Sequence, residues 1–176
     1  MEKVAEVATL LAAQIDTKGH KVDMIFVEHL ALVHDLMKAI AFRTYDPRSF
    51  QKKPTKADIA YWIEMKKKYR GNDIEATSDM LKKMRFKKLA AAVLSQQFDA
   101  VISKAYPLKT LEEKIVFYAD KRVAHTEIVP LSIRLKEGHL RYNAGVKKPK
   151  SDRLKKIELA IHMLEEEIWT LGDMSY

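Results

Sequence analysis

Residues 22–42 read VDMIFVEHLALVHDLMKAIAF, and this stretch decides the fold class. Its apolar residues recur at the three- and four-residue spacing of an α-helix and surround most of the helix axis. We therefore predict one helix over residues 22–42 and expect it to be the most buried helix of the chain. A membrane span is excluded because five polar residues interrupt the stretch, namely Glu28, His29, His34, Asp35 and Lys38.

Helical periodicity continues on both sides of this stretch. Upstream, the apolar residues at helical spacing predict one face of a first helix: Val4, Val7, Ala8, Leu11 and Ile15. We expect this helix to end near residues 17–19. Prolines, glycines and capping residues divide the rest of the chain into helices predicted over residues 55–71, 74–84, 86–104 and 110–123, from residue 130, and over 151–171, with loops at 43–54 and 145–150. The pattern predicts an all-α fold, a single compact bundle of about seven to eight helices over residues 1–176.

Composition and charge exclude several classes of protein. Apolar residues make up 47% of the chain and charged residues 32%, a balance unlike that of a disordered chain or a membrane protein. Residues 1–16 lack the uninterrupted apolar centre of a secretory signal, so we expect a cytoplasmic location. The net charge of +8 favours polyanionic partners such as nucleotides, RNA or phosphorylated metabolites, although solvated helix faces explain the same basic runs. Because the chain has no cysteine, any metal site must use histidine and carboxylate ligands.

Two features of the sequence carry candidate chemistry. His34 and Asp35 lie inside the predicted buried helix, and Asp120 follows the apolar run 115–119. A buried ionisable group needs a hydrogen-bond partner, an opposite charge or a bound cation. Since consecutive helix residues project about 100° apart, His34 and Asp35 need a ligand from another helix to enclose one ion, and Asp120 is the candidate. The pattern alone leaves a second interpretation open, a satisfied core histidine and an aspartate that pairs two helices.

Three segments resemble parts of a known family in their order and spacing. They are residues 4–8 (VAEVA), 27–38 (VEHLALVHDLMK) and 110–121 (TLEEKIVFYADK). The middle segment is similar to the helix that gives the HD superfamily of metal-dependent phosphohydrolases its name. The last segment resembles the one that supplies the family's final metal-binding aspartate, and the first resembles the opening helix of the domain. The resemblance covers residues 1 to about 142, and we expect the helix over 151–171 to pack against that domain.

The resemblance implies that His34, Asp35 and Asp120 bind a divalent cation, with Asp35 acting in catalysis. Imidazole and carboxylate ligands suit Mn²⁺, Fe²⁺, Ni²⁺ or Zn²⁺, which lower the pKa of a bound water and polarise a phosphoryl oxygen. Lys38 lies four residues after His34, on the same face of the predicted helix, where its ammonium would bind a substrate phosphate. Family members often have a lysine there, but an ammonium that extends into solvent is an equal alternative.

Several departures from the family pattern concern the metal. The family's first histidine would stand just before Met1, so we expect the natural chain to extend upstream and the ion to be weakly bound without that residue. Members with a second metal carry histidines in the middle of the domain, where this chain has Asn-Asp at 72–73 and Gln-Gln at 96–97. Met37 replaces a glycine, which would put a bulky side chain near the substrate. The remaining histidines are interpreted as structural or surface residues: His20, His29, His125, His139 and His162.

The expected function is metal-dependent hydrolysis of a nucleotide or another small phosphate ester. The alternative is a catalytically degenerate HD domain that binds a nucleotide or another protein. We predict no membrane partner and no specific nucleic acid, and the sequence leaves a homo-oligomer open.

Overall fold

The structure, a computed structural model, describes residues 1–42, 45, 53–69, 72–143 and 151–174, with the backbone alone at 139–143 and 151. Its α-helices are α1 (Glu2–Thr17), α2 (Met24–Val33), α3 (Lys56–Lys68), α4 (Asp73–Lys83), α5 (Lys87–Val93), α6 (Leu111–Arg122), α7 (Leu131–Asn143) and α8 (Ser151–Gly172). Between them lie the 3-10 helices η1 (Lys38–Ala41), η3 (Leu94–Gln96) and η4 (Ala100–Ile102), and the antiparallel strands β1 (Val123–Ala124) and β2 (Glu127–Ile128). The all-α prediction is confirmed. The predicted loops at 43–54 and 145–150 lie largely outside the described residues.

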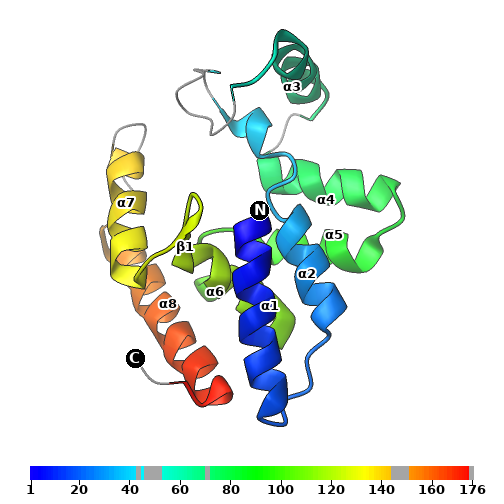
Figure 1. Cartoon of the computed structure of the whole chain (residues 1–176). Helices are drawn as coiled ribbons and strands as arrows, with labels where there is room; N and C mark the ends of the chain where they lie inside the picture. Colours follow the sequence, from blue (N-terminus) through cyan, green and yellow to red (C-terminus); the bar gives the residue numbers. More distant parts are fainter. Residues whose placement is uncertain (43–44, 46–52, 70–71, 144–150, 175–176) are drawn as a thin grey trace.

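Helix α6 lies at the centre of the fold (Figure 1), and its residues 115–119 are completely buried. Helices α1, α2, α7 and α8 contact it, while α4 and α5 pack as a pair beside α2, and α3 lies farther out against η1. The prediction that residues 22–42 form the most buried helix is wrong, because Ile25, Leu32 and Leu36 from that stretch are exposed. None of the described helices is long and apolar enough to cross a membrane.

The helix predicted over residues 22–42 ends early, and this end positions the candidate site. Helix α2 stops at Val33, and His34 is its C-terminal cap. Beyond the cap, the backbone hydrogen bonds span three residues instead of four. The amide of Met37, which would continue the α-helix, donates instead to Thr77 Oγ1 of α4 at 3.2 Å. A tertiary hydrogen bond therefore outweighs helix propensity here, and a turn leads into η1.

Two of the predicted helix starts are confirmed by their capping bonds. Thr55 Oγ1 accepts a hydrogen bond from Asp58 N at 3.1 Å, and Asp58 Oδ2 accepts one from Thr55 N at 2.8 Å, which completes a capping box at the start of α3. Thr110 Oγ1 accepts from Glu113 N at 3.3 Å at the start of α6. These bonds are local in sequence, and for that reason the residue pattern predicts them.

The helix predicted over residues 86–104 is too long. Helix α5 ends at Val93, and two 3-10 helices follow it. Ser95 Oγ donates to Ala92 O at 2.7 Å, and Gln97 Nε2 donates to Leu94 O at 3.2 Å. Side chains that bond to nearby carbonyl oxygens compete with the helical hydrogen bonds, so the α-helix gives way to tighter turns.

A buried polar network joins α6 to α8. Tyr118 Oη donates to Glu165 Oε1 at 2.8 Å and accepts from Trp169 Nε1 at 2.7 Å and from Arg122 Nη1 at 2.6 Å. Tyr118 and Glu165 are both buried, so the network satisfies polar groups that water does not reach. Burial disfavours the charged phenolate and raises the pKa of Tyr118 to about 12.

This raised pKa predicts a loss of stability in alkaline solution. The neutral Tyr118 phenol stabilises the folded state fully below its ordinary pKa of 10.0, and this contribution is lost as the pH rises through about 12. A shift of two pKa units corresponds to about 2.7 kcal/mol. Urea unfolding across this pH window should show a steeper fall in the free energy of unfolding for the wild type than for Tyr118→Phe. Equal slopes for the two proteins would contradict the assignment.

Candidate functional site

His34 lies at the C-terminal end of α2 with its ring inside the protein, where it is 5% exposed. Its ring Nδ1 lies 2.7 Å from Ala31 O. Because a carbonyl oxygen only accepts hydrogen bonds, Nδ1 carries a proton, and in the neutral ring Nε2 carries the lone pair. The end of α2 therefore presents Nε2 as an acceptor or a ligand.

Two carboxylates face this nitrogen from different elements. His34 Nε2 lies 3.6 Å from Asp120 Oδ1, on α6, and 3.8 Å from Asp35 Oδ2, in the turn after α2. The prediction that the three side chains converge is confirmed by these distances. Both separations are longer than a good hydrogen bond. His34 Nε2 therefore makes no short hydrogen bond to either carboxylate in this arrangement.

The charges require something positive at His34 Nε2. A lone pair that faces two carboxylate oxygens is repelled by them, unless a proton or a metal cation lies at that nitrogen. Burial alone lowers the pKa of His34, but the carboxylates of Asp120 and Asp35 outweigh it and raise this pKa above its ordinary value. Burial alone would raise the pKa of Asp120, but Lys121 and His34 hold it well below its usual range. The carboxylates therefore favour a proton on His34, and His34 in turn favours the charged form of Asp120.

Lys38 lies near the same side chains, but it does not share a helix with His34 as the sequence predicted. The sequence placed Lys38 and His34 on one helix face, whereas residues 34–37 form a turn and Lys38 begins η1. Its Nζ lies 3.4 Å from Asp35 Oδ1 and 3.2 Å from Asp73 Oδ2. Burial lowers the pKa of Lys38, but Asp35 and Asp73 raise it above its ordinary value. The side chain is 50% exposed, so the charged ammonium is also accessible to a ligand.

A cavity of about 330 Å³ opens onto these groups, and we call it the His34 cavity. It is lined by His34, Asp35, Lys38, Ile74, Gln96, Phe98, Asp120, Lys121, Arg134, Leu135 and Gly138. Two of these side chains add positive charge that the sequence analysis missed. Lys121 Nζ donates to Asp120 Oδ2 at 2.6 Å, and Arg134 Nε donates to Val123 O at 2.8 Å. The position of Lys121 next to Asp120 was a usable signal, whereas Arg134 comes from α7, whose placement only the fold reveals.

Gln96 contributes a buried acceptor at the wall of this cavity. The residue is 7% exposed, and its Nε2 donates to Ser95 Oγ at 3.2 Å and to Glu113 O at 3.3 Å. Its Oε1 is buried and has no hydrogen-bond partner among the described residues. A buried acceptor without a donor is unfavourable.

The ligand types suit a first-row divalent ion, but the distances between the donor atoms are slightly too long for one. One imidazole and two carboxylates are ligands that such ions prefer, and metal-binding histidines commonly donate their other ring N–H to a carbonyl, as His34 does to Ala31. Bonds of about 2.0–2.2 Å place adjacent ligands roughly 3–3.5 Å apart, so the donor atoms would have to approach by a few tenths of an ångström. As the side chains stand, no three His, Asp or Glu residues within the described ranges are arranged to hold a metal ion.

Met37 lies away from the cavity, which corrects the expectation that it crowds the substrate. Its side chain is buried in a small second core with Ile40, Met65 and Ala76, because the turn after α2 directs it toward α3 and α4. The other histidines whose side chains are described do not line the His34 cavity: His20, His29, His125 and His162. The side chain of His139 lies outside the described part of the chain.

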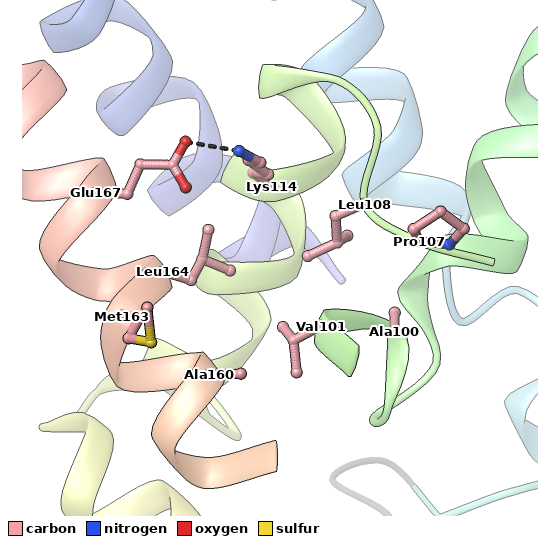
Figure 2. A pocket seen from close by; sticks show the side chains of 9 residues that line it. All are labelled: Ala100, Val101, Pro107, Leu108, Lys114, Ala160, Met163, Leu164 and Glu167. Atoms are coloured by element: carbon pink, nitrogen blue, oxygen red, sulfur yellow. Dashed lines mark hydrogen bonds and ion pairs between the residues drawn. The ribbon is translucent and has the colours of Figure 1, made fainter. Parts of the chain in front are cut away.

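Another cavity, of about 440 Å³, lies between η4 and α8 (Figure 2). Its walls are mostly apolar and include Val101, Leu108 and Met163. The charged residues that line it, Lys114 and Glu167, pair with each other at 2.6 Å. This cavity is lined by one carboxylate and no histidine, whereas the His34 cavity is lined by a histidine and two aspartates and is therefore the candidate site.

No protein-family model, curated protein or solved structure matches this chain. The resemblance to the HD superfamily therefore stays a prediction.

Proposed function

We propose that this chain is a cytoplasmic metal-dependent phosphohydrolase of the HD type that acts on a nucleotide or another small phosphate ester. The observation that supports the proposal is the orientation of His34. Its Nδ1 is fixed by Ala31 O, and its Nε2 faces Asp35 and Asp120. One divalent cation held by these three side chains would satisfy the imidazole and both carboxylates together.

The other residues of the cavity have roles that follow from their charge. When bound, the divalent ion polarises a phosphoryl oxygen and acidifies a water molecule. Lys38, Lys121 and Arg134 line the cavity and would bind the remaining phosphate oxygens. Asp35 accepts a proton from water as the water oxygen bonds to phosphorus. The ester P–O bond would break on the opposite side of phosphorus, where the leaving oxygen takes a proton from solvent water; this releases an alcohol and inorganic phosphate, and Asp35 then loses its proton to solvent.

A second function is favoured by the pairing of these carboxylates with lysines. Lys38 pairs with Asp35, and Lys121 pairs with Asp120 at 2.6 Å, so the protein's own cations neutralise both acids. A site balanced in this way requires no metal. It would belong to a degenerate HD domain that binds a nucleotide or another protein without hydrolysis.

Metal analysis of purified protein with His34→Ala as the variant distinguishes the two functions. The hydrolase requires a first-row ion in the wild type that is lost in the variant, together with phosphatase activity on a panel of nucleotides and sugar phosphates. Circular dichroism should show the same helical content in both proteins. A wild type that takes up no Mn²⁺, Ni²⁺ or Zn²⁺ in titrations, yet binds nucleotide, would refute the hydrolase and support the binding module.

A further inference from the structure

A third cavity, of about 340 Å³, adjoins the His34 cavity, and we call it the Asn72 cavity. Ile74 and Phe98 line both cavities. Asp73, which lines the Asn72 cavity, also pairs with Lys38 of the His34 cavity at 3.2 Å. One extended molecule can therefore contact both cavities, with its two ends in different chemical surroundings.

The walls of the Asn72 cavity suit a flat ring without charge. Phe98 is 41% exposed, so its ring is accessible for stacking. The apolar side chains of Ile74, Leu154 and Ile157 form further parts of the lining. The charged pair Arg153 and Asp99 is self-neutralising through its salt bridge. An uncharged planar group is therefore favoured over a phosphate or a carboxylate.

Two amide side chains provide one donor and one acceptor in this cavity. Asn72 Oδ1 accepts a hydrogen bond from Glu75 N at 2.7 Å, which leaves the NH₂ group of Asn72 without a partner among the described residues. Gln97 Nε2 donates to Leu94 O at 3.2 Å, which leaves Gln97 Oε1 as an acceptor. These bonds fix which end of each amide is free. A nucleobase edge carries both donors and acceptors and can therefore bond to either group.

The boundary between the cavities has acceptors that a sugar would satisfy. Gln96 Oε1 and Asp73 Oδ2 are buried and have no hydrogen-bond donor within the described part of the chain, although Asp73 Oδ2 keeps its ion pair with Lys38. Gln96 lines the His34 cavity and Asp73 lines the Asn72 cavity. Neither oxygen is exposed as the side chains stand, so hydroxyl groups of a ribose placed between the cavities would reach them only after these side chains turned toward the ligand.

We propose that the Asn72 cavity binds the base of a nucleoside monophosphate, with Phe98 stacking on the base and the phosphate in the His34 cavity. Asn72 and Gln97 recognise the base edge. The position of the phosphate rests on the proposed hydrolase function, whereas binding of the base requires neither a metal nor hydrolysis.

Calorimetric titration of the full chain in EDTA tests this site, with adenosine, guanosine, cytidine, uridine and ribose 5-phosphate as probes. At least one nucleoside should bind, and Phe98→Ala should weaken its binding by about tenfold or more, because stacking on the ring is lost. Asn72→Asp keeps the acceptor that caps α4 and removes only the NH₂ donor, so nucleoside binding should weaken by roughly threefold to tenfold. Phe86→Ala removes a similarly exposed phenyl ring outside both cavities and should change nothing.

The possible outcomes separate this inference from the proposed function. If no nucleoside binds, or if Phe98→Ala binds nucleosides as the wild type does, the base site is refuted. If the wild type hydrolyses ribose 5-phosphate and nucleotides equally well, and Phe98→Ala does the same, the base site also fails while the hydrolase stands. If a nucleoside binds through Phe98 but no metal or hydrolysis is found, the base site stands and the hydrolase fails.

Discussion

Asp35→Asn should lower turnover on phosphate esters by about a thousandfold and strongly reduce the bound metal while the helical fold is retained. The substitution keeps the shape of the side chain, but it removes both the negative charge that would bind the cation and the proton acceptor. Asp35 is part of a surface turn, and its ion pair with Lys38 at 3.4 Å is partly exposed, so the folded state should lose less than about 1 kcal/mol. Metal content, steady-state kinetics and thermal unfolding of the purified variant measure the three effects separately.

Asp79→Asn is a matched control for this experiment. Asp79 also pairs with the lysine three residues after it, Lys82, at 3.2 Å, and it does not line the His34 cavity. The control therefore removes the same charge and the same kind of ion pair without touching the site. Metal content and turnover that stay unchanged in Asp35→Asn would refute the role of Asp35, whereas equal losses in both variants would point to a general effect of charge.

The convergence of the candidate site could be predicted because buried charges have few solutions. His34, Asp35 and Asp120 stand in apolar surroundings in the sequence, and isolated ionisable groups are unfavourable in a core. The simplest expectation is therefore that they lie together, and in the structure the carboxylates of Asp35 and Asp120 both lie within 3.8 Å of His34 Nε2. The stripe of α8 was predictable for a similar reason, since Ile157, Ile161 and Ile168 recur at helical spacing and are all buried.

The rest of the site depends on tertiary contacts that periodicity does not reveal. The end of α2 at Val33 is accompanied by a hydrogen bond from Met37, in the turn after α2, to Thr77 of α4, a contact between residues forty positions apart in the chain. Arg134 lines the cavity because α7 packs against α6. The residues that flank Arg134 in the sequence do not predict this position. The sequence therefore identified the centre of the candidate site and Lys38, whereas the place of Arg134 in the cavity wall depends on how α7 packs.

Tyr118→Phe should destabilise the folded protein by about 3 kcal/mol, the other large effect that we expect. The phenyl ring keeps its place in the core of α6, so almost no apolar contact is lost. The missing hydroxyl removes the 2.8 Å donor to Glu165 Oε1, which keeps its longer ion pair with Arg122 at 3.5 Å, and it removes the acceptor that Arg122 and Trp169 share. Because Glu165 is buried, water cannot readily replace the lost bond. In a chain of this size the midpoint of thermal unfolding should fall by roughly 6–12 °C.

Tyr106→Phe is the control, because Tyr106 is exposed and its hydroxyl takes part in no hydrogen bond within the described part of the chain. The same atom is removed, so any effect of the substitution that does not depend on the network appears in both variants. Calorimetric unfolding of the wild type and both variants at neutral pH gives the comparison. The network explanation requires the loss at Tyr118 to exceed the loss at Tyr106 by more than about 2 kcal/mol. Equal stabilities would show that α6 and α8 are joined by apolar packing alone, with the hydroxyl groups contributing little.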